Sequence, residues 1–156
     1  MIQHIHIFDC DGVLLDSTHR YRTMKCGTRI DLDHWRENST PEMIAKDKPL
    51  PMAEYYKAVL ADPTQYVIIA TARVCSEADH KVIAEKLGKP QHFISRDPDD
   101  SQSGTTLKLN ALRKLLNLRQ FKDAAITVYE DNVTYLNGIA DALGASKHYC
   151  PSAQGH

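Results

Sequence analysis

Two carboxylates stand two residues apart at the end of an apolar run near the start of the sequence. Residues 5–17 read IHIFDCDGVLLDS, so that Asp9 and Asp11 follow the apolar run and Gly12 comes directly after them. Like charges buried side by side are unfavourable unless a cation lies between them. The spacing therefore indicates a cation-binding site. An EF-hand calcium loop is not indicated, because apolar residues follow Gly12 where that loop needs oxygen donors.

Five short apolar runs predict β-strands, and helical patterns separate them. The runs cover residues 2–8, 66–70, 92–94, 125–129 and 146–149. Apolar residues recur with helical spacing after Pro51, after a capping-box pair at Ser76 and Asp79, over 107–118, and over 136–143 before Gly144. Apolar strands that alternate with helices predict a parallel sheet covered on both faces.

The ends of three predicted strands carry polar or charged residues. In chain order these are Asp9, Asp11, Thr71, Arg73, Glu130 and Asp131. Because ligands bind outside the carboxyl ends of strands in an open parallel sheet, these residues are expected to share one site. Acids from two strands predict a hard cation with oxygen ligands, most simply Mg²⁺. Taken singly, a surface ion pair at Arg73 and a helix cap at 130–131 explain these residues equally well.

The ordered motifs resemble those of the haloacid dehalogenase (HAD) superfamily of phosphatases and phosphotransferases. The similarity lies in DCDGVLLDS, in the strand end at Thr71, in Lys108 at the start of a helix, and in YEDN at 129–132. The similarity spans residues 5–149. Within the superfamily, the sequence is most similar to small phage-type members and to the phosphatase domain of bacteriophage polynucleotide kinase, to which the TAR motif at 71–73 corresponds. The resemblance implies a Rossmann-like three-layer α/β/α fold with a mainly parallel five-stranded sheet.

The resemblance also implies catalytic roles. Asp9 would attack phosphorus and form an aspartyl phosphate, and Asp11 would act as general acid and then as general base. Mg²⁺ would be held by Asp9, the Asp11 carbonyl and Asp131, and Lys108 would supply a second positive charge. An ordinary surface lysine is the alternative for Lys108.

Three further residues receive roles from the resemblance. Thr71 would hydrogen-bond a phosphoryl oxygen, and Arg73 would clamp a phosphate with its planar guanidinium. Glu130 would bind the metal or steady Lys108. Because Asp11 is present, phosphate chemistry is favoured over carbon–halogen chemistry.

An insert at about 17–50 follows the first strand and is too short for a full helical lid. It is locally basic, with Arg20 and Arg22 next to Tyr21 and with Trp35 further on. Cations that alternate with aromatic rings are typical of nucleotide or single-strand sites, so Arg20 and Arg22 are candidate substrate contacts. A solvated loop around one buried tryptophan is the alternative. The segment between Arg73 and Lys108 leaves no room for a large cap, so the site is expected to be open.

Composition sets the broad class. The chain has 156 residues, is 42% hydrophobic and has a formal net charge of -1, which predicts one globular domain over 1–156 and no global attraction to nucleic acid or membrane. Four scattered cysteines without a C-x-x-C pair favour a reducing cytoplasm. No targeting or membrane-length apolar segment is seen in the sequence. The oligomeric state is not indicated.

Together with the resemblance, these patterns predict a cytoplasmic Mg²⁺-dependent phosphomonoesterase acting on a nucleotide or a polynucleotide end, with a 3′-phosphate slightly preferred. A phosphatase for small metabolites such as phosphosugars is the alternative enzyme. A non-catalytic phosphate-binding module is the alternative outside enzymes, although such a module has no need for a nucleophile at Asp9.

Overall fold

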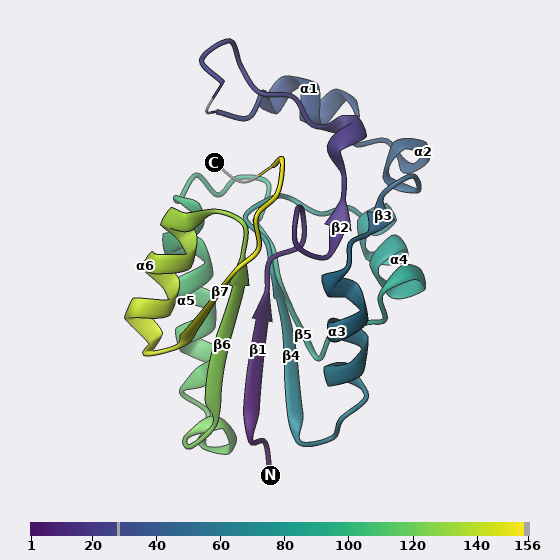
Figure 1. Cartoon of the computed structure of the whole chain (residues 1–156). Helices are drawn as coiled ribbons and strands as arrows, with labels where there is room; N and C mark the ends of the chain where they lie inside the picture. The colour runs from purple at the N-terminus through teal and green to yellow at the C-terminus, as the bar shows by residue number, and fades with distance from the viewer. Residues whose placement is uncertain (28, 155–156) are drawn as a thin grey trace.

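The computed structural model describes residues 1–27 and 29–154 and has a central five-stranded sheet. The strand order is β5-β4-β1-β6-β7, and every neighbouring pair is parallel (Figure 1). The strands are β1 (His4–Phe8), β4 (Gln65–Ala70), β5 (His92–Ile94), β6 (Ala125–Glu130) and β7 (Ser146–Tyr149). All five predicted strands are confirmed, with ends that move by at most two residues.

Four helices cover the two faces of the sheet. They are α3 (Met52–Leu60), α4 (Glu77–Lys86), α5 (Gly104–Leu116) and α6 (Val133–Leu143). Side-chain alternation along β1 explains the two layers, because Phe8 packs in one buried cluster with α3 and α4, and Ile5 and Ile7 pack in another with α5 and α6. The predicted three-layer α/β/α architecture is confirmed.

The predicted helix signals are present as local structure. Ser76 and Asp79 form a reciprocal capping box at the start of α4. Gly144 adopts a left-handed conformation, with φ of 64°, at the end of α6. The capping box and Gly144 therefore define where α4 begins and where α6 ends.

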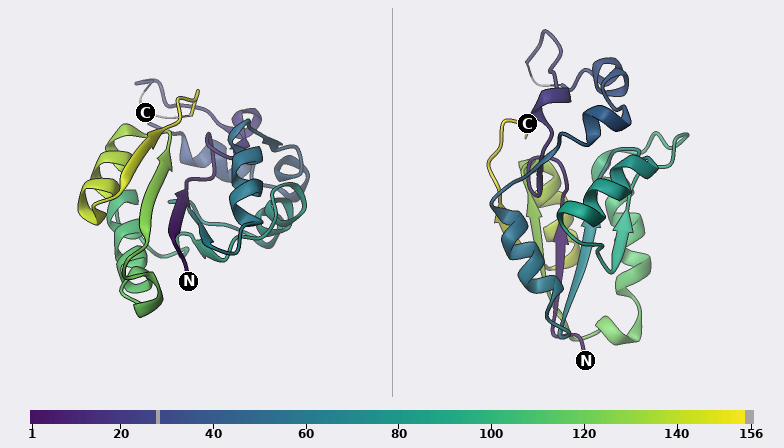
Figure 2. Two further views of the ribbon diagram at one scale, coloured as in Figure 1. Left: turned by 60° about the horizontal axis from the view of Figure 1, so that its bottom comes forward. Right: turned by 90° about the vertical axis from the view of Figure 1, so that its right-hand side faces the viewer.

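The insert lies beyond the carboxyl ends of the strands (Figures 1 and 2). It contains the 3₁₀ turn η1 (Thr18–Arg20), α1 (Leu32–Glu37) and α2 (Pro41–Ile44), and β2 (Leu15–Asp16) pairs with β3 (Lys48–Pro49) at its base. Position 28 of the predicted insert and positions 155–156 of the predicted domain lie outside the described residues. The insert thus approaches the edge of the sheet where the polar strand ends meet.

None of the helices in the described part of the chain combines the length and the apolar character needed to cross a bilayer.

Candidate active site

The carboxyl edge of the sheet brings the predicted strand-end residues together. Asp9 directly follows β1, and its backbone N–H donates to the Tyr129 carbonyl of β6 over 2.9 Å. Thr71 directly follows β4 and is buried. Glu130 closes β6 and Asp131 follows it. The register of parallel strands therefore places these side chains at one edge, as the sequence predicted.

Lys108 enters the same edge from the second turn of α5. Its side chain is only 1% exposed, and its Nζ lies 3.2 Å from Asp9 Oδ1 and 2.8 Å from Glu130 Oε2. Burial lowers the pKa of Lys108, but the carboxylates of Asp9 and Glu130 outweigh it, so the net shift is upward and the ammonium group stays charged. The alternative of an ordinary surface lysine is excluded by this burial.

Three carboxylates, two of them paired with this lysine, lie close together. Asp9, Glu130 and Asp131 each offer an oxygen within 4.8 Å of the others. Burial, followed by the charge of Glu130, raises the pKa of Asp9 well above its ordinary value. Burial and the charge of Asp9 raise the pKa of Asp131 to about 6. Burial is the larger cause of both shifts, and the neighbouring carboxylates add to it because one lysine stands against three acids.

The cluster fits a hard cation. Glu130 Oε1 is buried and has no hydrogen-bond partner among the described residues, although Oε2 of the same carboxylate is bound to Lys108. An orphaned buried oxygen beside two more carboxylates is a donor set that suits Mg²⁺, which prefers oxygen ligands. Glu130 was predicted to bind the metal or to steady Lys108, and the geometry fits both roles: Oε2 accepts from Lys108, and Oε1 has no donor among the described residues.

Asp11 is held through both of its carboxylate oxygens. Ser17 Oγ donates to Oδ1 over 2.9 Å, and Arg73 Nε lies 2.6 Å from Oδ2. Arg73 in turn pairs through Nη1 with Asp79 Oδ1 at 2.5 Å. The predicted phosphate clamp is therefore already engaged with two carboxylates, and the most direct effect of Arg73 is on the orientation of Asp11.

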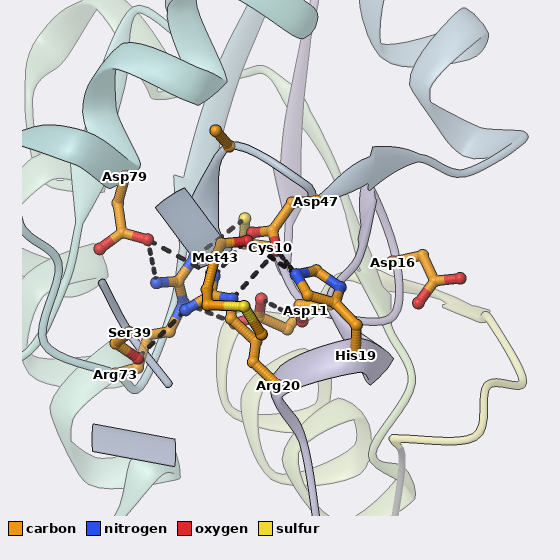
Figure 3. Close-up of polar contacts among 12 residues, drawn as sticks. Cys10, Asp11, Asp16, His19, Arg20, Ser39, Met43, Asp47, Arg73 and Asp79 are labelled. Atoms are coloured by element: carbon orange, nitrogen blue, oxygen red, sulfur yellow. Dashed lines mark hydrogen bonds and ion pairs between the residues drawn. The ribbon is translucent and has the colours of Figure 1, made fainter. Parts of the chain in front are cut away.

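Arg20 does not face the solvent, which corrects the sequence-based interpretation. Its side chain is 0% exposed, with Nε 3.0 Å from Asp47 Oδ1 and Nη2 2.6 Å from Asp47 Oδ2 (Figure 3). Its guanidinium also lies 4.3 Å over the ring of Trp35, which is itself buried. Arg20 points inward because the buried Asp47 carboxylate and the face of the Trp35 ring both stabilise its guanidinium group.

Arg22 behaves differently from Arg20. Its side chain is 60% exposed and pairs with Asp31 at 2.8 Å. Together with Lys25 and Arg29 it lines a hollow of about 770 Å³ in the insert. The residues that line this hollow include none of the strand-end residues of the carboxylate cluster.

Several residues at the site were not predicted from sequence. Ser17 lies within the quoted first motif, and Asp79 was noted only as a helix cap, so both carried a partial signal. Ser152 and Gln154, which contact the site from beyond β7, carried none. Only the fold brings these two residues to the carboxyl edge.

Several solved structures have a fold similar to that of this chain. A chain of the Pnkp1/Rnl/Hen1 RNA repair complex matches with a TM-score of 0.66 and 15% identity, over 97% of this chain and 43% of that one. A haloacid dehalogenase-like hydrolase from Streptococcus pneumoniae matches with a TM-score of 0.62 and 12% identity, over 93% and 83% of the two chains. D,D-heptose 1,7-bisphosphate phosphatase from B. bronchiseptica, complexed with magnesium and phosphate, matches with a TM-score of 0.57 and 16% identity, over 93% and 79%.

The chain thus spans less than half of the repair-complex chain, and at these identities the matches establish a common fold. A search of curated proteins found no match. A family model described as bacteriophage T5 5′-deoxynucleotidase matches residues 1–98, which is more than half of the sequence and includes both strand ends from Asp9 to Arg73. The predicted resemblance to phage-type members of the HAD superfamily is confirmed: the chain belongs to the bacteriophage T5 5′-deoxynucleotidase family and has a HAD-like fold.

Proposed function

We propose that the chain is a Mg²⁺-dependent phosphomonoesterase that hydrolyses deoxynucleoside 5′-monophosphates through an aspartyl phosphate on Asp9. The observation that carries the proposal is the position of Lys108, with its Nζ 3.2 Å from Asp9 Oδ1 inside a cluster of three carboxylates. A carboxylate nucleophile with a cation beside it and oxygen ligands for a metal suits phosphoryl transfer to aspartate.

The first half-reaction transfers the phosphoryl group to the enzyme. Asp9 attacks phosphorus in line, a bond forms between its carboxylate oxygen and phosphorus, and the bond from phosphorus to the sugar oxygen breaks. Asp11 gives a proton to the leaving oxygen. Ser17 and Arg73 keep the Asp11 carboxyl group oriented, and the Thr71 hydroxyl is assigned to a phosphoryl oxygen.

The second half-reaction releases phosphate. Asp11 takes a proton from water, the water oxygen attacks phosphorus, and the bond to Asp9 breaks, which regenerates the carboxylate. When bound by Asp9, Asp131 and the Asp11 carbonyl, Mg²⁺ supplies positive charge against the repulsion between nucleophile and phosphate. Lys108 supplies the second positive charge and is itself held by Glu130.

Two observations support a nucleotide as the substrate. The family description names a 5′-deoxynucleotidase, which favours the 5′-position over the 3′-phosphate expected from the resemblance to polynucleotide kinase. Tyr21 of the insert is close enough to Asp131 for the charge of that carboxylate, after burial, to raise the pKa of its phenol. An aromatic ring beside the catalytic edge suits stacking on a nucleobase.

The test is a substrate panel with purified protein. It contains deoxynucleoside and ribonucleoside 5′-monophosphates, nucleoside 3′-monophosphates, phosphosugars, and oligonucleotides phosphorylated at either end. Deoxynucleoside 5′-monophosphates should have the highest kcat/KM, EDTA should abolish turnover, and Mg²⁺ should restore it while Ca²⁺ does not, because its looser coordination misplaces the reacting groups. Brisk hydrolysis of phosphosugars without nucleotide turnover would contradict the nucleotide assignment.

A polynucleotide end is the second candidate substrate. It is favoured by the exposed basic side chains of Arg22, Lys25 and Arg29, which suit contacts with successive phosphates. Replacement of all three by Gln should then raise KM for a phosphorylated oligonucleotide and leave turnover of para-nitrophenyl phosphate unchanged. Equal kinetics of the triple variant and the wild type on the oligonucleotide would exclude this candidate.

A further inference from the structure

The segment that follows β7 folds back onto the catalytic edge. The Cys150 N–H donates to the Glu130 carbonyl over 2.9 Å, which extends the β6–β7 pairing to the residue before Asp131. The chain then passes over the carboxylate cluster, and we call residues 151–154 the strap. The yellow end of the ribbon shows this return above the strands (Figure 1).

The strap contacts the carboxylate assigned to the metal. Ser152 Oγ donates to Asp131 Oδ2 over 2.7 Å, and the Gln154 N–H donates to the same Oγ over 3.0 Å. The serine hydroxyl is therefore oriented by one bond and orients Asp131 by the other. Partners of this kind fix the orientation of carboxylate ligands at metal sites.

The strap also reaches the proposed general acid. Gln154 Nε2 donates to Ser17 Oγ over 2.9 Å, and its Oε1 accepts from the Ser17 N–H at 3.4 Å. Ser17 is completely buried and donates its own hydroxyl hydrogen to Asp11 Oδ1. Since the Ser17 oxygen accepts from Gln154, its hydrogen is directed to Asp11. One side chain of the strap thus sets the direction of the hydrogen bond that holds Asp11.

The turn after Asp11 is shaped to receive the strap. Gly12 has a φ of 81°, and a Cβ there would collide with Asp131 Oδ2 and lie 2.6 Å from Ser152 Oγ. A side chain at this position would therefore displace the Ser152–Asp131 pair. The absence of a side chain at Gly12 is an observation independent of the hydrogen bonds, and it shows that this turn, Asp131 and the strap pack in direct contact.

We propose that Ser152 and Gln154 are positioning residues of the active site, Ser152 for Asp131 and Gln154, through Ser17, for Asp11. This inference rests on the proposed function, in which Asp131 binds Mg²⁺ and Asp11 transfers protons. The two contacts predict separate effects: Ser152 acts on metal affinity, and Gln154 acts on turnover.

The experiment compares Ser152→Ala and Gln154→Ala with matched exposed controls, Ser101→Ala and Gln120→Ala. Isothermal titration with Mg²⁺ alone should show about tenfold weaker binding for Ser152→Ala, the lower end of the loss usual for partners of metal ligands. Ser152→Thr, which keeps the hydroxyl, should bind within about twofold of the wild type, a loss far smaller than that of the alanine variant. Gln154→Ala should lower kcat about tenfold with Mg²⁺ affinity and KM unchanged.

Several outcomes decide the inference. Mg²⁺ affinity of Ser152→Ala equal to that of Ser101→Ala would overturn the role of Ser152, and an unchanged kcat in Gln154→Ala would overturn that of Gln154. Parallel losses of Mg²⁺ affinity, kcat and thermal stability in both alanine variants would also overturn it, because they indicate a merely structural strap. A wild type that binds Mg²⁺ but hydrolyses no phosphomonoester would refute the proposed function, and the titrations would still decide the role of Ser152. A wild type that binds no Mg²⁺ would overturn both.

Discussion

Replacement of Arg20 by Met tests whether the insert is anchored by a buried ion pair. Arg20 and Asp47 are both fully buried and share two contacts, at 3.0 and 2.6 Å. Removal of one partner of such a pair typically costs about 3–5 kcal/mol, because the other charge stays buried without compensation. Burial already raises the pKa of Asp47, so its carboxyl group can take up a proton in the variant and limit the loss. We therefore expect about 3 kcal/mol at pH 7, the lower end of that range.

The loss in Arg20→Met should depend on pH. A carboxyl group whose folded-state pKa lies above its unfolded value stabilises the fold relatively more at low pH, and this contribution disappears as pH rises through the folded-state pKa. Without Arg20 the pKa of Asp47 rises further, so the variant should be closer to the wild type at pH 5 than at pH 7. At about 2–4 °C per kcal/mol, a loss of about 3 kcal/mol lowers Tm by roughly 6–12 °C.

The assay is urea unfolding followed by circular dichroism, with Arg22→Met as the matched control. Because Arg22 is largely exposed, its replacement should leave the unfolding midpoint unchanged. The double variant Arg20→Met/Asp47→Leu should recover part of the loss, since it removes both buried charges. The reasoning is refuted if Arg20→Met and Arg22→Met unfold at the same urea concentration and Arg20→Met weakens binding of an oligonucleotide.

Three further predictions follow from the site and the core. Asp9→Asn should lower kcat at least about a thousandfold, near 4 kcal/mol of barrier, with the fold retained; near-normal turnover would remove Asp9 from the mechanism. Asp131→Asn should weaken Mg²⁺ binding in calorimetry more than Glu130→Gln, because Glu130 is also bound to Lys108, and equal losses would mean that the pair is wrongly assigned. Burial lowers the pKa of His6 below its ordinary 6.5, so stability should be full above pH 6.5 and decrease as pH falls toward the folded-state pKa. His6→Phe should flatten this dependence in urea unfolding between pH 5 and 8, and an unchanged slope would exclude His6 as its source.

The sheet and the edge that carries the candidate site could be predicted because their signals are local. An apolar run that stops at a polar residue defines both the strand and its end, and parallel register then collects the ends at one edge. Asp9, Thr71 and Asp131 were found in this way, and the cap at Ser76 was found because capping depends on residues three positions apart. Strand ends and helix caps can therefore be predicted from neighbouring residues alone.

The orientation of the insert and the strap could not be predicted for the opposite reason. Arg20 and Arg22 are two residues apart with similar neighbours, yet one is buried on Asp47 and the other is exposed. The difference depends on a carboxylate far away in sequence. Ser152 and Gln154 are likewise ordinary polar residues until the return of the chain beside β6 places Ser152 on Asp131 and Gln154 on Ser17.

The placement of charge at this edge supports the proposed dependence on a divalent cation. On the side of the insert, the guanidinium groups of Arg20 and Arg73 pair with Asp47, Asp79 and Asp11, so that two cations meet three carboxylates. On the other side, Lys108 alone meets Asp9 and Glu130, and Asp131 lies beside them.

The uncompensated negative charge therefore lies where an anionic phosphate would approach, and it adds to burial, the larger cause, in raising the pKa values of Asp9 and Asp131. Protonation of Asp9 would relieve the repulsion but would destroy the nucleophile. A divalent cation relieves it while Asp9 stays ionised, and it also attracts the phosphate. The proposed dependence on Mg²⁺ thus rests on the shortage of cationic side chains around Asp9, Glu130 and Asp131 as much as on the presence of suitable ligands.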